Sequence, residues 1–294
     1  MKTVLIGLGD IGKHHNVGLR KSALFELAAV CDVNPEAPSR AIYADIPFYT
    51  DEEQMLAEVK PELAVLATPP STHAAIARIC AAHGVQTLVE KPLASNEKEV
   101  ASLTELIRQG KLNIIYHWMF SPEILWFKRN IRTYNARKIH FHVEDPYTDE
   151  TGHVVPTRCV LGGCWIDSGV NVLSVLSLWE DLSALTPVEI RHTRENGIPV
   201  ETHAVFRSPK LEVEIDISWR TRRNFKETTF WIGDDTYVMH HSMQSVSKNG
   251  EMLFRDDSMD RLDRHYYNFY CLYPSSLISA STTEMIHNIL FDNI

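Results

Sequence analysis

The chain has 294 residues, 44% hydrophobic and 23% charged content, and a formal net charge of -9 at pH 7. This composition indicates a soluble globular protein with room for one large domain or two ordinary ones. The negative charge argues against a nucleic-acid partner, and no segment is apolar over the length of a membrane helix. The five cysteines form no C-x-x-C pair, so we expect no disulfide framework or zinc ribbon and a cytoplasmic protein.

A strand, a glycine turn and a helix are predicted first. Thr3–Ile6 is a short run of strand formers, too short for a signal peptide. It leads into Gly7–Gly12, which fits G-x-G-x-x-G, and residues at helical spacing follow. Gly7 would allow the tight turn, Gly9 would admit a pyrophosphate, and Gly12 would let the helix pack closely. The phosphates would bind at the free N–H groups of the helix start.

An acidic residue ends the second predicted strand. Leu27–Cys31 is apolar, and Asp32 follows twenty residues after Gly12. A carboxylate at this place can accept a hydrogen bond from a ribose 2′-hydroxyl and would repel the 2′-phosphate of NADP. The pattern therefore predicts a dinucleotide site that prefers NAD, with NADP as the alternative. An ordinary α/β turn with a solvated Asp32 is the competing interpretation.

Strands and helices alternate up to about residue 120. Further strands are expected at Leu63–Ala67, Gln86–Val89 and Asn113–Tyr116, with a helix capped by Ser95 or Asn96 before the last of them. Nearly continuous apolar strands between amphipathic helices indicate a doubly wound parallel sheet. Its ligands would bind at the carboxyl ends of the strands.

The periodicity changes after about residue 120. Leu211–Trp219 alternates strictly between apolar and polar residues, which predicts a strand with one solvated face. Further strands are expected at Lys138–Glu144, Pro187–Thr193, Glu201–Phe206, Thr228–Ile232 and Thr236–His240, and helices near 122–133, 164–179 and 282–294. We therefore expect an N-terminal Rossmann domain at 1–120 and, at 121–294, an α+β domain with a mostly antiparallel open sheet.

Polar or conformationally restricted residues follow the later strands of the first domain. Thr68-Pro69 follows one strand, and Glu90-Lys91-Pro92 ends the next. Proline keeps the preceding residue extended, so Lys91 would face the cleft beside a nicotinamide. His117 and Trp118 follow the fifth strand and form a polar-tipped aromatic group suited to a sugar-like ligand.

The order and spacing of these motifs resemble the Gfo/Idh/MocA family of oxidoreductases over essentially the whole chain. The segments that carry the resemblance are Gly7–Gly12, Asp32, Ala67–His73, Glu90-Lys91-Pro92 and Phe120-Ser121-Pro122. The resemblance implies a Rossmann domain followed by an α/β domain with an open antiparallel sheet. It also implies that Lys91 reaches the reacting carbon, that the Lys91–Pro92 bond is cis, and that the protein forms a homodimer or homotetramer.

One position departs from the family pattern. Asp167 and Asn171 stand four residues apart on a predicted helix and would share one face. Many family members carry a histidine in place of Asn171, where it serves as a general acid and base. An amide cannot take up a proton, so Asn171 would orient the substrate and leave proton transfer to Lys91 or Asp167.

The set of Lys91, Asp167 and Asn171 resembles the aldose 1-dehydrogenases that act on L-arabinose and D-galactose. This implies oxidation of the C1 hydroxyl of an aldopyranose to the lactone, because the acidic anomeric hydroxyl needs only a weak base. Three alternatives stay open: a dehydrogenase of inositol or of another sugar carbon, a sugar–sugar oxidoreductase with tightly held cofactor, and a non-catalytic sugar sensor.

The expected site residues follow from these patterns and the resemblance. For the cofactor they are Gly7, Gly9, Asp10, Ile11, Gly12, Asp32, Thr68, Pro69, His73, Glu90 and Lys91. For the substrate they are His117, Trp118, Glu144, Trp165, Asp167 and Asn171, with Asp145 as a weaker candidate. His140 and His142 share a strand face, but no third ligand stands at matching spacing, so no metal site is expected.

Overall fold

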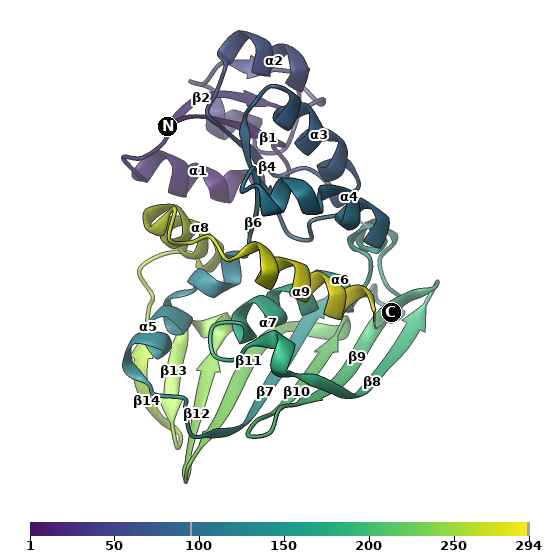
Figure 1. Ribbon diagram of the computed structural model, residues 1–294, viewed down its shortest axis with the longest axis vertical. Coiled ribbons are helices and arrows are strands. Elements are labelled where there is room, and N and C mark those ends of the chain that lie inside the picture. The colour runs from purple at the N-terminus through teal and green to yellow at the C-terminus, as the bar shows by residue number, and fades with distance from the viewer. Residues whose placement is uncertain (95, 293–294) are drawn as a thin grey trace. The chain divides into compact units, whose positions relative to one another are not determined.

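The computed structural model describes residues 1–94 and 96–292 (Figure 1). The chain divides into two compact units. The first combines Met1–His117 with Leu262–Glu284, and the second combines Trp118–Arg261 with the residues from Met285 onward. The helices in the described part of the chain are all too short or too polar to traverse a lipid bilayer.

A parallel sheet forms the centre of the first unit. Within the described residues it has six strands in the order β3-β2-β1-β4-β5-β6. The strands are β1 (Lys2–Ile6), β2 (Glu26–Cys31), β3 (Phe48–Tyr49), β4 (Leu63–Leu66), β5 (Gln86–Glu90) and β6 (Leu112–Ile115). Every residue of β4 is buried, as expected for a parallel strand covered on both faces. This strand order is the doubly wound order of dinucleotide-binding domains, so the predicted N-terminal fold is confirmed.

Helices cover this sheet, and most of them follow a strand directly. They are α1 (Gly12–Lys21), η1 (Arg40–Tyr43), α2 (Glu52–Val59), α3 (Pro70–Ala82), α4 (Glu97–Arg108) and α8 (Arg261–Leu272). Asn96 caps α4, because its side chain accepts a hydrogen bond from the Glu99 amide at 3.1 Å. The alternative cap, Ser95, lies outside the described residues. Two of the elements, β3 and α2, were not predicted from the sequence pattern.

Helix α8 joins the first unit from the far end of the chain. It packs against α1, where the buried His15 Nδ1 lies 2.7 Å from the Tyr270 hydroxyl. The close approach depends on Gly18, because a Cβ there would collide with the Tyr270 ring and lie 2.9 Å from the Tyr266 carbonyl oxygen. A small residue in α1 thus makes room for the aromatic face of α8.

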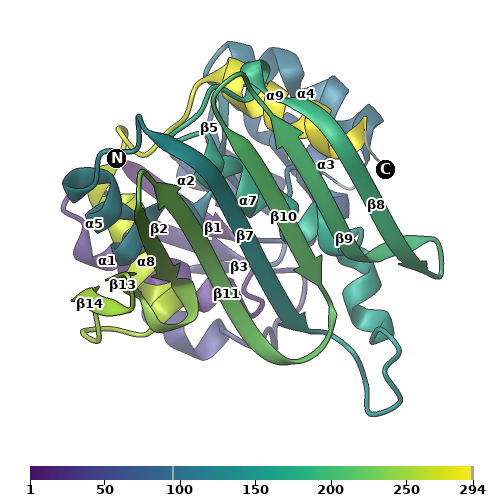
Figure 2. The ribbon, with the colours of Figure 1, turned by 90° about the horizontal axis from the view of Figure 1, so that it is seen from below.

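A large open sheet forms the second unit (Figure 2). Within the described residues it has eight strands in the order β14-β13-β12-β11-β7-β10-β9-β8. The strands are β7 (Ala136–Pro146), β8 (Thr186–Glu195), β9 (Ile198–Arg207), β10 (Glu212–Ser218), β11 (Arg220–Ile232), β12 (Asp235–His240), β13 (Ser245–Lys248) and β14 (Glu251–Arg255). Strands β7 and β10 are parallel, and the other neighbouring pairs are antiparallel. The predicted mostly antiparallel sheet is therefore confirmed.

The helices of the second unit lie on one face of its sheet. They are α5 (Pro122–Asn130), η3 (Pro156–Leu161), α6 (Cys164–Asp167), α7 (Gly169–Leu176), η4 (Leu182–Ala184) and η5 (His241–Met243), while η2 (His117–Phe120) and α9 (Ala280–Phe291) contain residues of both units. Alternate residues of β7, namely Ile139, Phe141 and Val143, are fully or almost fully buried on the face toward the helices. The residues between them face the other side.

One predicted helix is interrupted. The single helix expected up to about Trp179 is instead two short helices that meet at Ser168. Helix α7 then ends at Leu176, where Ser177 is its C-cap. Ser168 uses its hydroxyl to donate a hydrogen bond to Asp145 of β7 at 3.0 Å. This bond to the sheet anchors the residue at which the helix is interrupted.

Candidate functional site

The glycine turn at the end of β1 has two glycines that the packing requires and one that it does not. A Cβ on Gly7, whose φ is +100°, would lie 2.5 Å from the Ala67 carbonyl carbon, and a Cβ on Gly12 would lie 2.7 Å from the Gly7 oxygen. A Cβ on Gly9 would meet nothing within 4 Å. The space beside Gly9 is therefore open, as a turn that receives a pyrophosphate needs. Asp10 and Ile11 are exposed just before α1.

Asp32 is fixed beside this turn. Its Oδ2 accepts a hydrogen bond from the Leu8 amide at 2.7 Å, and its Oδ1 accepts one from the Asn34 amide at 2.9 Å. The two bonds hold the carboxylate at the carboxyl end of β2 and next to the glycine turn. Each carboxylate oxygen can accept a further hydrogen bond, so a ribose hydroxyl can still be bound there.

His73 joins the loops that follow β4 and β5. Its ring is fully buried, with Nε2 2.8 Å from the Thr68 oxygen and Nδ1 3.1 Å from the Pro92 oxygen. Burial lowers the pKa of His73, although its carbonyl partners oppose the shift. Pro69 is the N-cap of α3 in the adjacent turn. His73 thus braces the two loops from inside the unit, and its expected contact with the cofactor stays a prediction.

Glu90 and Lys91, at the end of β5, lie in different surroundings. Glu90 is buried, and its Oε1 accepts a hydrogen bond from the Tyr266 hydroxyl at 2.7 Å and lies 3.2 Å from His15 Nε2. Burial raises the pKa of Glu90, but His15 and the other polar neighbours outweigh it, so the pKa is lowered overall. Lys91 is only half-buried, and its bond to Pro92 is cis, as the family resemblance implied. The Glu90 side chain therefore belongs to an internal network with Tyr266 and His15.

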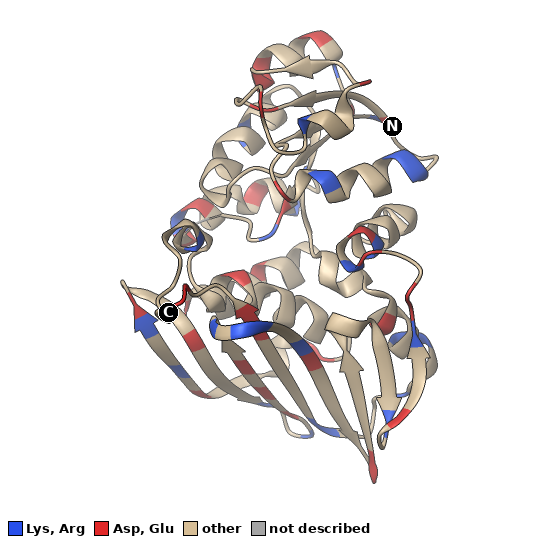
Figure 3. Cartoon of the chain, turned by 180° about the vertical axis from the view of Figure 1, so that it is seen from behind, with Lys and Arg blue, Asp and Glu red and all other residues tan. Residues whose placement is uncertain are grey.

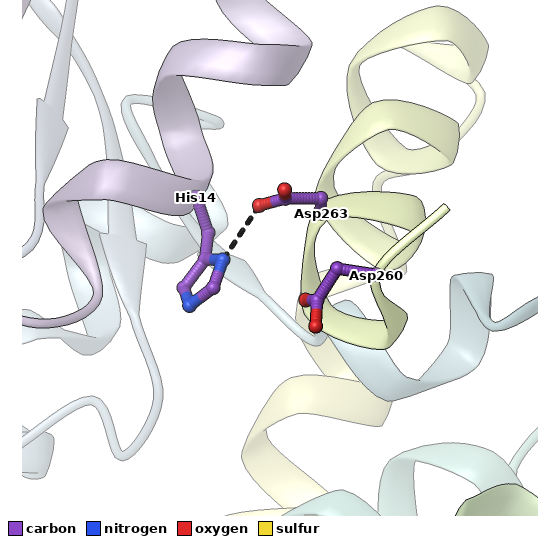
Figure 4. Close-up of side chains that lie close together, drawn as sticks. All are labelled: His14, Asp260 and Asp263. Carbon is purple, nitrogen blue, oxygen red and sulfur yellow. Dashed lines mark hydrogen bonds and ion pairs between the residues drawn. The ribbon is translucent and has the colours of Figure 1, made fainter. Parts of the chain in front are cut away.

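Two histidines extend this network along α1 and α8. His14 Nδ1 lies 2.7 Å from Asp263 Oδ1, and Figure 4 shows this contact between α1 and α8. His117, expected to contact a substrate, is mostly buried, with Nδ1 3.2 Å from His265 Nδ1. The structure therefore places His117 among the residues of α8.

In the second unit, Asp167 and Asn171 lie on consecutive helical turns on either side of Ser168. Asp167 ends α6 and is only 5% exposed. Asn171 belongs to α7, and its Nδ2 donates to the Asp167 carbonyl oxygen at 3.5 Å. The Asn171 Oδ1 is buried and has no hydrogen-bond partner among the residues that the structure describes. It is an acceptor that a substrate hydroxyl could satisfy.

A mostly buried lysine that no sequence pattern had indicated belongs to the same unit. Lys226 of β11 donates from Nζ to Asp145 Oδ1 at 2.5 Å and to Asn224 Oδ1 at 2.9 Å. Burial lowers the pKa of Lys226, and the negative charge of Asp145 opposes this shift. The other oxygen of Asp145, Oδ2, accepts a hydrogen bond from the Ser168 hydroxyl. Asp145 thus links Lys226 to the residue that follows Asp167.

Three expected substrate residues are placed elsewhere. Glu144 lies on the face of β7 opposite to Asp145, because successive side chains of a strand alternate, and its carboxylate pairs there with Arg223 at 2.5 Å. Trp165 is fully buried and donates from Nε1 to the Leu290 oxygen at 3.1 Å. Trp118 is 2% exposed and packs against the His241 ring. Glu144 thus lies on the outer sheet face, and both tryptophans lie in the core.

Comparisons with known proteins match the first unit to a family of oxidoreductases. Residues 1–117 match the model of the oxidoreductase family, NAD-binding Rossmann fold (GFO_IDH_MocA). The rhizopine catabolism protein MocA of Rhizobium meliloti is 30% identical over 171 residues, which are 57% of this chain and 53% of that protein. The UDP-N-acetylglucosamine 3-dehydrogenase of Acidithiobacillus ferrooxidans is 32% identical over 113 residues, 38% of this chain and 35% of that protein. The chain therefore spans about half or less of these curated relatives.

The likeness in fold extends over both units. A solved levoglucosan dehydrogenase in complex with NADH has a TM-score of 0.82 and 12% identity, and the match covers 99% of this chain and 95% of that one. At this identity the likeness concerns the fold alone. The first unit contains the residues of the family match, the open turn at Gly9 and the cis Lys91–Pro92 bond. Residues 1–117 therefore match the NAD-binding Rossmann domain of the Gfo/Idh/MocA oxidoreductase family.

Proposed function

We propose that the protein is an NAD(P)-dependent dehydrogenase that oxidises the C1 hydroxyl of an aldopyranose to the lactone. The observation that carries the dehydrogenase part is the glycine turn, in which Gly9 leaves open space beside a fixed Asp32 carboxylate. The match to an NAD-binding family and the fold of a dehydrogenase solved with NADH support it. The choice of C1 rests on the residue set Lys91, Asp167 and Asn171.

NAD is the cofactor that the first unit fits best. The Asp32 carboxylate is held by two backbone amides, so it cannot easily swing away from a bound ribose. A fixed negative charge there favours a free 2′-hydroxyl and repels a 2′-phosphate. Gly7, Gly9 and Gly12, together with the N–H groups before α1, would hold the pyrophosphate.

The protein side chains then supply binding and proton transfer. NAD held at the glycine turn would supply the acceptor for the hydride from C1 of the sugar. Lys91 or Asp167 takes the hydroxyl proton, which balances the oxidation of the alcohol to the lactone. Asn171 holds a sugar hydroxyl through its unpartnered Oδ1, and the Lys226–Asp145 pair holds the turn around Ser168 in place.

Oxidation at another ring carbon is the second candidate. It is favoured by the name of one curated relative, a UDP-N-acetylglucosamine 3-dehydrogenase. The two candidates differ in what they require of the substrate, because only C1 oxidation needs a free anomeric hydroxyl.

A substrate panel tests both candidates. The absorbance of reduced nicotinamide is followed with aldoses, their methyl glycosides, inositols and nucleotide sugars, using NAD and NADP separately. We expect reduction of NAD with an aldose and none with its methyl glycoside. Reduction that survives the C1 block would move the reaction to another carbon. No reduction at all, despite measurable NAD binding, would contradict dehydrogenase activity on these sugars and favour a sensor.

Lys91→Ala tests the proton-transfer role. We expect turnover to fall about 100- to 10,000-fold, the usual range for loss of a general acid–base group, while the Kd for NAD stays the same. Exposed Lys98 of α4 provides a matched control, since Lys98→Ala should leave both quantities unchanged. Full turnover in Lys91→Ala would remove Lys91 from the mechanism.

A further inference from the structure

The outer face of the second sheet gathers histidines and carboxylates on three neighbouring strands. His140 of β7 lies opposite Glu214 of β10, and Asp216 of β10 lies opposite both His142 of β7 and His203 of β9. These residues alternate with the buried residues of their strands, so their side chains lie on the face opposite to the helices. Figure 2 shows this face of the sheet. Figure 3 shows acidic and basic positions along the same strands.

Asp216 is the centre of this group. Its Oδ2 lies 2.7 Å from His140 Nε2, and its Oδ1 lies 2.8 Å from His203 Nδ1. One ligand atom each from His140, Glu214 and Asp216 lie within 4.8 Å of one another. A single ion placed among these atoms could therefore contact all three after small side-chain movements.

The charges around Asp216 are unbalanced. On the same strand, Glu212 pairs with Arg207 at 2.8 Å and Glu214 pairs with Lys138 at 2.5 Å. The ion pairs of Asp216 in the described part of the chain are with His140 and His203. Asp216 thus pairs with neither a lysine nor an arginine among the described residues.

We propose that His140, Glu214 and Asp216 form a binding site for a divalent transition-metal ion, with Zn²⁺ as the best fit. Zn²⁺ takes imidazole nitrogen at about 2.0–2.1 Å and carboxylate oxygen at about 2.0–2.2 Å. The imidazole ligand disfavours Mg²⁺ and Ca²⁺, which prefer sets of oxygen ligands. Lys138 pairs with one oxygen of Glu214, which is its ion pair in the described part of the chain, and the other oxygen could bind the ion.

His203 has a supporting role in this site. His203 Nδ1 contacts Asp216 Oδ1, whereas His140 contacts the other oxygen. A hydrogen-bond partner of this kind orients a ligand carboxylate and tunes its affinity for the metal. His203 and Asp216 also line a surface hollow of about 590 Å³. Solvent or a small ligand could therefore reach an open coordination position on the ion.

The spacing of His140 and His142 alone did not reveal this site. The missing ligands come from β10, with Asp216 standing 76 residues after His140. They meet only because β10 pairs in parallel with β7. A network of ion pairs without a metal uses the same residues, so the test must measure the ion itself.

Calorimetric titration of the chelator-treated protein with Zn²⁺ is the direct test. We expect one ion per chain, with affinity reduced about 10- to 100-fold or more in His140→Ala and Asp216→Asn. His142→Ala is the matched control, because His142 lies on the same strand face but pairs with Glu144 at 2.9 Å. Its affinity should be unchanged. Equal binding by all four proteins, or no stoichiometric binding, would overturn the proposal.

Two further measurements keep the test independent of folding and of catalysis. Co²⁺ in place of Zn²⁺ should give visible absorption bands in the wild type and in His142→Ala, and none in His140→Ala. If Asp216→Asn does not fold, Glu214→Gln replaces it with the same expected loss. NAD binding should be the same in all variants, so the outcome does not depend on the proposed dehydrogenase activity.

Discussion

At the scale of single residues, the three glycines of the first turn have different tasks. Gly7 and Gly12 have backbone atoms where a Cβ would stand, whereas Gly9 has open space. Packing thus explains two of the glycines, and the open space at the third suits the pyrophosphate that we propose binds there.

The variants Gly9→Ala and Gly12→Ala separate folding from cofactor binding. We expect Gly9→Ala to keep the melting temperature of the wild type and to weaken NAD binding at least about 10-fold, since a methyl group would occupy the space of a phosphate. Gly12→Ala should lower the free energy of unfolding by about 1–3 kcal/mol, as overpacking does. Thermal unfolding and NAD titration check both. A Gly9→Ala protein with normal NAD affinity would contradict the assigned site.

Lys226 offers a second test at this scale. Lys226→Met leaves the Asp145 carboxylate buried without its cation, which typically costs about 3–5 kcal/mol of stability. We expect a raised KM for the sugar as well, with an unchanged Kd for NAD. Asp145→Asn combined with Lys226→Met should recover much of the stability but not the KM. If the double variant recovered both, Lys226 would have a purely structural role.

At the scale of elements, the contact of α1 with α8 is tight. Gly18→Ala would improve the helix propensity of α1 by about 1 kcal/mol, but the new methyl group would collide with the Tyr270 ring. We expect the collision to dominate and the stability in urea to fall by about 1–3 kcal/mol. Lys13→Ala, at an exposed position of the same helix, is the control and should unfold like the wild type.

The first unit could be predicted largely from the sequence because its signals are local. The turn at Gly7–Gly12 and Asp32 stand within one strand–helix–strand stretch, and four-residue strands such as β4 carry their own apolar pattern. The same locality explains what was missed. Lys226 meets Asp145 across 81 residues, and the periodicity of α8 does not show on which sheet or helix it packs. The interruption at Ser168 depends on a bond to β7 that no helical pattern reveals.

At the scale of the whole molecule, the paired carboxylates determine the response to acid. The Arg223 hydrogen bond lowers the pKa of Glu144 to about 2, and His140 and His203 lower the pKa of Asp216 to about 2, against the effect of burial. A carboxylate with a lowered pKa stabilises the folded state above its unfolded pKa of about 4, and this stabilisation is lost as the pH falls from there toward the folded value.

Urea unfolding as a function of pH tests this effect. We expect the free energy of unfolding to fall between about pH 4 and pH 2. Glu144→Gln should be less stable at neutral pH and should lose less on acidification. Glu251→Gln, an exposed position on β14, should follow the wild-type curve. Parallel curves for the wild type and Glu144→Gln would exclude Glu144 as a cause of acid sensitivity.

The division of the chain also has a consequence for its biosynthesis. The first unit consists of residues 1–117 and Leu262–Glu284. The ribosome therefore synthesises α8, which packs against Gly18 of α1, only after all of β7 to β14. During that interval α1 exposes the surface against which Tyr270 later packs. A fragment cut after residue 117 would keep this surface exposed permanently. Dissection of the protein into its two units therefore requires a circular permutation or a linker that carries α8, and not a single cut.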